Sequence, residues 1–226
     1  MRVTYWLAEV RERIGCDAAA DLQDVPALAE VSALEFGLYA QQRRRPSDAT
    51  LKLVEQVVPQ TRTAYEIGPY EINLWGILEG DRKTCMDTLD AELQRLGEDL
   101  TRRRFTLGEK AGQLWMLMLP EHLHHWKSLD ELLDMAPFNI VARTYAIGQG
   151  EYTRINRVKG RVYSAPVIAG VIALWMLCKQ QPDDDGFLRS RYMLEGVLEE
   201  ALLEEFPSGL GDLLTAHLRS EIAATQ

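Results

Sequence analysis

Residues 165–178 read APVIAGVIALWMLC and form the most apolar run of the chain. Val, Ile, Leu and Trp residues fall on every side of a helix drawn through this run, so we expect the helix to be buried on all faces. The run has 14 residues, whereas a transmembrane helix needs roughly 17–25. It therefore predicts the central helix of a globular core and no membrane span.

Helical periodicity continues on both sides of this run. Apolar residues recur three and four positions apart, and no stretch shows the sustained alternation of a strand. The sequence therefore predicts an all-α protein. The expected helices cover residues 3–14, 17–24, 27–42 or 32–42, 48–58, 74–78, 86–100, 110–119, 128–135, 140–147, 166–179, 187–206 and 210–222. Gly15 should end the first of these helices in a left-handed cap, and Ser47 should cap the helix at residues 48–58. The residues of the first helix expected to face inward are Tyr5, Trp6, Val10 and Ile14.

Two turn signals divide the chain. Gly68 with Pro69 and Gly80 with Asp81 flank a short expected helix, and we interpret this stretch as a junction. The predicted divisions are a small helical bundle in residues 1–60, the junction in residues 61–82, and a larger α-helical domain for dimerisation or sensing in residues 83–226.

An apolar seam follows the junction. Its members lie three and four residues apart, as in two heptads of a coiled coil: Met86, Leu89, Leu93, Leu96 and Leu100. Such a seam packs either against its own domain or against a second copy of the chain. A coiled coil usually needs three or four heptads, which favours packing within the domain. A homodimer formed through the seam is the alternative.

Charge and cysteine content limit the classes of function. The formal net charge is -9 over 226 residues, so DNA binding would require a local basic patch. Cys16, Cys85 and Cys178 lie too far apart in sequence for a redox or zinc motif, which favours free thiols in a reducing compartment. The N-terminal residues lack the apolar core of a signal peptide. We therefore expect a cytoplasmic protein.

Residues 31–54 read VSALEFGLYAQQRRRPSDATLKLV. This stretch resembles the second half of the helix-turn-helix domain of Xre-type, phage-repressor-like proteins, and the resemblance extends over about residues 3–58. In that family the recognition helix opens with a Val-Ser pair, here Val31 and Ser32, and a basic turn ends in Pro-Ser. The resemblance implies an N-terminal helix-turn-helix-like domain in which Phe36 and Tyr39 face the interior.

The same resemblance implies a DNA-binding transcriptional regulator of the prokaryotic type, with double-stranded DNA as its partner. A recognition helix brings donors and acceptors to base edges in the major groove, and arginines beside it contact phosphates. The C-terminal helical domain would then form a homodimer or sense a protein partner. The implied DNA-binding residues are Ser32, Glu35, Gln41, Gln42, Arg43, Arg44 and Arg45.

The outward positions of this helix leave a second function open. Ala33, Leu34, Gly37 and Leu38 offer few hydrogen bonds to bases. From residue 183 onward the chain has ten acidic and three basic residues, which would repel a phosphate backbone. The alternative is a non-catalytic protein-interaction module, such as an antitoxin, an adaptor or a phage-defence component, that binds through an acidic helical surface.

The sequence contains no recognisable catalytic motif. It lacks a GxSxG nucleophile motif, a P-loop and a GxGxxG motif before a helix. His122, His124 and His125 cluster near Glu121, but they lack the four-residue spacing of helical zinc ligands and a matching Cys or Asp cluster elsewhere. We therefore expect no enzyme activity, no metal site and no cofactor.

Overall fold

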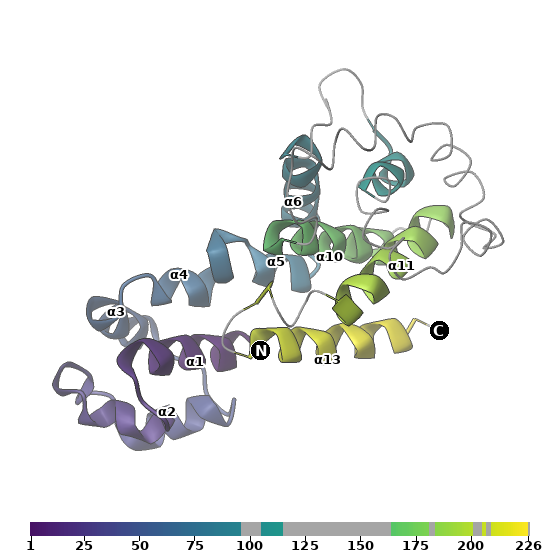
Figure 1. Cartoon of the computed structure of the whole chain (residues 1–226). Coiled ribbons are helices and arrows are strands. Elements are labelled where there is room, and N and C mark those ends of the chain that lie inside the picture. Colours follow the sequence, from purple (N-terminus) through teal and green to yellow (C-terminus); the bar gives the residue numbers. More distant parts are fainter. Residues whose placement is uncertain (96–104, 115–163, 181–183, 201–204, 207–208, 226) are drawn as a thin grey trace. The chain divides into compact units, whose positions relative to one another are not determined.

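The computed structural model describes residues 1–95, 105–114, 164–180, 184–200, 205–206 and 209–225, and every regular element among them is a helix (Figure 1). This confirms the predicted all-α class. The α-helices with named bounds are α1 (Arg2–Ile14), α2 (Ala33–Ala40), α3 (Asp48–Val57), α4 (Thr61–Glu66), α5 (Leu74–Leu78), α6 (Arg82–Arg95), α10 (Ala165–Gln180), α11 (Asp184–Glu200) and α13 (Leu210–Ala223). Residues 107–114 are also helical. The short 3-10 helices are η1 (Ala19–Asp24), η2 (Pro26–Leu28) and η3 (Pro69–Glu71).

The chain divides into two compact units. The first, here called the N-terminal unit, contains residues 1–75 together with 202–226, and the second, the central unit, contains residues 76–201. This division differs from the predicted boundaries after residues 60 and 82. Residues 61–75 belong to the N-terminal unit because Tyr65 and Trp75 pack against aromatic side chains of α1.

Helix α1 lies between α2 and α4 in the N-terminal unit (Figure 1). Trp6 of α1 is fully buried, and its ring lies edge-on to Tyr39 of α2 and Tyr65 of α4, with centroid distances of 6.1 and 5.9 Å. Ile14 is only partly buried against the same cluster. Burial confirms the other inward-facing residues predicted in this region: Tyr5, Trp6, Val10, Phe36 and Tyr39.

The helix ends of this unit agree with the sequence in part. Gly15, expected to cap α1, has a φ of 80°, a left-handed conformation that glycine adopts without a steric penalty. The helix expected over residues 17–24 is the 3-10 helix η1, which is tighter and shorter. Pro26 opens the separate 3-10 helix η2, so α2 does not begin near residue 27 but after Ser32, the other predicted start.

In the central unit, α10 packs mainly against α6 and also against α11. Apolar side chains around its whole circumference are buried, including Ile168, Ile172 and Trp175. Helix α6 approaches closely where Gly170 stands, because a Cβ atom on that residue would lie 3.3 Å from the Cβ of Glu92. The buried core helix predicted from residues 165–178 is therefore confirmed as α10.

The described part of the apolar seam packs inside the chain. Leu89 and Leu93 of α6 are fully buried, and α6 covers α10, which supports packing within the domain over a coiled coil. Other expectations lie outside the described residues: Leu96, Leu100, the helices at residues 128–135 and 140–147, and the histidine cluster. No described helix combines the length and the apolar content that a membrane crossing requires.

Because α10 is buried, truncation of one of its apolar side chains should leave a cavity and destabilise the protein. Ile172→Ala should lower the free energy of unfolding by about 2–5 kcal/mol, through lost transfer energy and an unfilled space. Leu34→Ala is the control, because Leu34 is 73% exposed and its truncation should change that free energy by less than about 0.5 kcal/mol. Denaturant midpoints of the full chain measure both. Equal midpoints for Ile172→Ala and the parent would contradict the buried position.

Candidate nucleic-acid interface

Helix α2 begins at a side-chain cap. The Oγ of Ser32 accepts a hydrogen bond from the backbone N–H of Glu35 at 3.2 Å, which satisfies one of the unpaired donors of the first turn. Val31, Phe36 and Tyr39 are buried on the inner side of this segment. Ser32 itself is exposed, so the start of α2 faces solvent and is open to a ligand.

Helix α2 ends in a turn that reverses the chain. The N–H of Gln42 donates to the carbonyl of Tyr39, and the N–H of Arg43 donates to the carbonyl of Leu38, both at 2.9 Å. These two bonds form a Schellman motif. In this motif the residue that follows the C-cap takes a left-handed conformation and is usually glycine. Here that residue is Gln42, with a φ of 56°. The backbone therefore enters the arginine turn in a strained but fixed direction.

The far side of the turn is anchored in the same manner. The Oγ of Ser47 accepts from the N–H of Thr50 at 3.1 Å and lies 2.9 Å from the Oγ1 of Thr50, which confirms Ser47 as the predicted cap of α3. The Tyr39 hydroxyl lies 3.5 Å from the same Thr50 oxygen in a buried contact between α2 and α3. Pro46 is also buried. Both ends of the turn are therefore held by the core.

The basic turn, defined as Arg43, Arg44 and Arg45, is exposed along its whole length. Arg44 pairs with Glu35 of α2, with 3.1 Å between Nη1 and Oε1. Within the described part of the chain, neither Arg43 nor Arg45 forms an ion pair. Together with Glu35, the turn therefore carries a local net charge of about +2, counted from fully ionised side chains.

The predicted base-reading residues form a sparse surface. Gln41 is exposed at the C-terminal end of α2, and the Gln42 side chain accepts a hydrogen bond from the N-terminal ammonium at 3.3 Å. Glu35 is engaged by Arg44. The most exposed large side chain of α2 is apolar, since Leu34 is 73% exposed. This surface offers phosphate-binding charges and one apolar contact but few hydrogen bonds that distinguish bases.

The thiol of Cys85 is buried in helix α6. Burial raises the pKa of the Cys85 thiol to about 11, so this thiol is protonated and poorly nucleophilic at neutral pH. No three His, Cys, Asp or Glu side chains come together as metal ligands would in the ranges that the structure describes.

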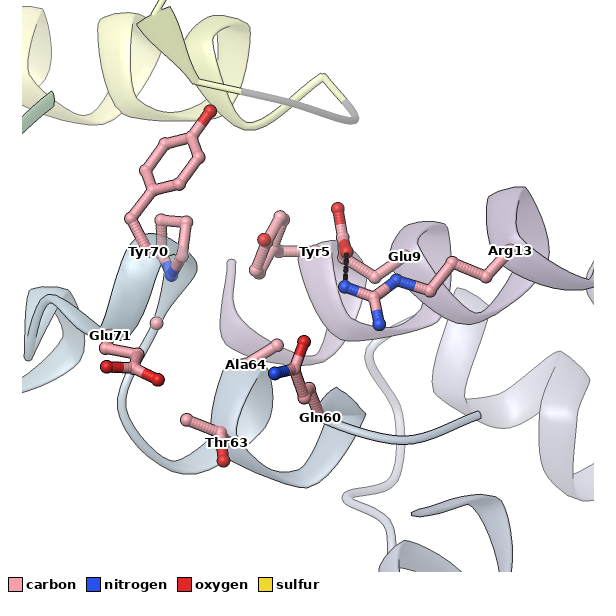
Figure 2. Close-up of a pocket in the computed structure, with 10 residues that line it drawn as sticks. Tyr5, Glu9, Arg13, Gln60, Thr63, Ala64, Tyr70 and Glu71 are labelled. Carbon is pink, nitrogen blue, oxygen red and sulfur yellow. Dashed lines mark ion pairs between the residues drawn. The ribbon is translucent and has the colours of Figure 1, made fainter. Parts of the chain in front are cut away.

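A second candidate site was not predicted from the sequence. Tyr5, Glu9 and Arg13 of α1 line a pocket together with Tyr70 and Glu71 of η3 (Figure 2). The four-residue spacing of Glu9 and Arg13 is typical of a helical ion pair and could have been noticed. Nothing local in the sequence indicates that η3 lies beside these residues.

Comparison with known proteins gives no relative for this arrangement. No family model matches the chain, and neither a curated protein nor a solved structure is significantly similar to it. The resemblance of residues 31–54 to Xre-type proteins therefore stays a prediction.

The strained end of α2 yields a stability prediction. Gln42→Gly should raise the free energy of unfolding by about 0.5–1 kcal/mol. Glycine removes the steric cost of the left-handed conformation, and this gain exceeds the loss that comes from the larger conformational entropy of the unfolded chain. Gln41→Gly should lower the free energy of unfolding by about 0.5–1 kcal/mol. Gln41 has a negative φ of -82°, so glycine relieves no strain there and only increases the conformational entropy of the unfolded chain. Denaturant unfolding of both variants measures the difference. A destabilised Gln42→Gly variant would contradict the strained cap.

Proposed function

We propose that this protein is a DNA-binding transcriptional regulator of the prokaryotic type, whose N-terminal unit contacts duplex DNA through the basic turn. The observation that carries the proposal is a pair of exposed arginines, Arg43 and Arg45, without an ion-pair partner among the described residues, on a turn held at both ends. Lys and Arg side chains that neutralise phosphates supply most of the non-specific affinity of DNA-binding proteins.

The fixed turn favours binding because its order is established before DNA arrives. The Schellman bonds to Leu38 and Tyr39 and the cap at Ser47 hold the backbone on either side of the arginines. A preorganised segment loses less conformational entropy on association than a free loop. The pairing of Glu35 with Arg44 also neutralises a carboxylate that would otherwise repel phosphates.

The electrostatic contribution is local. Residues 1–60 contain seven Arg and Lys residues and nine Asp and Glu residues, so the attraction comes from the turn and not from the whole bundle. In the proposed complex, the exposed N-terminal end of α2 faces the major groove and Leu34 contacts an apolar base edge such as a thymine methyl group. We therefore expect backbone contacts to dominate affinity and sequence preference to be modest.

Substitution of the basic turn tests the proposal. The triple variant Arg43→Ala, Arg44→Ala, Arg45→Ala should bind duplex DNA more weakly at every sequence. The dependence of the logarithm of affinity on the logarithm of salt should flatten by about two to three charges. Fluorescence anisotropy of a labelled generic duplex, measured from about 50 to 200 mM salt, gives both values.

A matched variant separates the effect of the basic turn on DNA binding from the effect of the total charge of the protein. Arg82→Ala, Lys83→Ala, Arg219→Ala removes the same three charges from exposed positions elsewhere in the chain and should leave the salt slope close to that of the parent. Equal affinities for the basic-turn variant and the parent would refute the role of the turn. So would equal losses in the two triple variants.

We further propose that the regulator acts as a homodimer. Helix-turn-helix proteins generally read two half-sites separated by about one turn of DNA, which two copies of the N-terminal unit would match. Light scattering of the full chain at tens of micromolar should therefore give about twice the chain mass of 25.7 kDa. A mass of 25.7 kDa under these conditions would contradict the dimer.

The exposed Leu34 favours one other function, a protein-interaction module. A leucine that is 73% exposed on a helix with few polar neighbours suits the centre of a protein contact better than a groove of DNA. The anisotropy experiment also separates these functions. Absence of duplex binding by the parent at about 50 mM salt would favour the interaction module over the regulator.

A further inference from the structure

The pocket between α1, α4 and η3 lies entirely within the N-terminal unit (Figure 2). It has a volume of about 440 Å³, within the range of roughly 300–1,000 Å³ that small-molecule sites occupy. Figure 2 shows that side chains from three separate segments surround the space. The lining includes Tyr5, Glu9, Arg13, Gln60, Thr63 and Glu71.

Unusual backbone conformations are concentrated around this pocket. Gln60, Tyr70 and Glu71 have φ values of 70°, 56° and 60°, and Gln42 is the only other non-glycine residue with positive φ in the described ranges. Such conformations cost about 1–3 kcal/mol each and persist where the surrounding structure enforces them, often at ligand sites. The strained residues therefore mark this pocket as a candidate ligand site, and its side chains decide which ligand it fits.

Among the described residues that line the pocket, Arg13 is the only cation, and it is already neutralised there. The Nη2 of Arg13 lies 3.3 Å from the Oε2 of Glu9, and its Nη1 donates to the carbonyl of Pro59 at 2.8 Å. The Tyr5 hydroxyl donates to the same Glu9 carboxylate, and burial together with the charge of Glu9 raises the pKa of Tyr5. Glu9 is only 8% exposed, so these donors hold a buried carboxylate in place.

The remaining polar groups suit a positively charged ligand. With Glu9 and Arg13 balanced, the exposed Glu71 carboxylate leaves the lining with a net charge of about -1 from fully ionised groups. Gln60 and Thr63 add neutral oxygen acceptors, and Tyr70 adds a ring that is 60% exposed. Carboxylates, neutral acceptors and aromatic faces together attract cations with N–H donors. An anion would meet the Glu71 carboxylate and, among the described lining residues, no unpaired cation.

We propose that this pocket binds a small organic cation that carries a guanidinium or ammonium group. The ligand would place its N–H donors toward Glu71 and the acceptors of Gln60 and Thr63. The proposal goes beyond DNA binding and does not rest on it, because the basic turn contributes no residue to the pocket. The cation is either a free amine or an Arg or Lys side chain of another protein.

Calorimetric titration of the full chain tests this proposal with defined probes. Agmatine represents a free amine, N-acetylarginine amide represents a protein side chain, and glutarate represents an anion of similar size. Saturable binding of agmatine alone identifies free amines as the source, and binding of N-acetylarginine amide identifies a side chain. Glutarate should not bind. Absence of binding by both cations up to about 10 mM, or preferential binding of glutarate, would overturn the site.

Variants locate the binding in the pocket. Glu71→Gln should weaken the bound cation about three- to fivefold, the contribution of a solvent-exposed ion pair. Thr63→Lys introduces a tethered ammonium group into the pocket wall and should abolish binding. Glu12→Gln, on the exposed part of α1 and outside the lining, is the matched control and should bind as the parent does. Unchanged affinity in Glu71→Gln and Thr63→Lys would place the cation elsewhere and refute the proposal.

Discussion

The packing of the Trp6 ring between Tyr39 and Tyr65 determines the positions of the basic turn and of the pocket. The indole is fully buried, with ring centroids 6.1 Å from Tyr39 and 5.9 Å from Tyr65. Edge-to-face aromatic pairs contribute about 0.5–1.5 kcal/mol each beyond the area that they bury. Tyr39 belongs to α2, which leads into the basic turn, and Tyr65 belongs to α4, which forms a wall of the pocket. One side chain of α1 therefore orients two potential binding surfaces.

The basic turn and the pocket carry local net charges of opposite sign. At the basic turn, Glu35 neutralises one arginine and leaves a net positive charge. In the pocket, Glu9 neutralises Arg13 and Glu71 leaves a net negative charge. The local pairing, and not the overall charge of -9, decides which ligand each surface attracts. An acidic protein can thereby present a phosphate-binding turn and a cation-binding pocket in one small bundle.

Much of the fold could be predicted from the sequence because its causes are local. An apolar run without a polar face indicates a buried helix, and this run is α10; glycine and serine in suitable positions indicated the caps at Gly15 and Ser47. The left-handed Gln42 and the Tyr70–Glu71 turn could not be predicted, since tertiary contacts impose positive φ on residues that disfavour it. The same applies to the pocket, which forms only when η3 meets α1.

Hydrogen–deuterium exchange of the full chain, with and without a generic duplex, tests the proposed DNA contact most directly. Amide protection reports where a ligand covers or orders the backbone, segment by segment. We expect added protection in residues 31–47, which span the start of α2 and the basic turn, and little change in α10. Saturating duplex that protects no peptide in residues 31–47, or protects only segments elsewhere, would contradict the proposed contact.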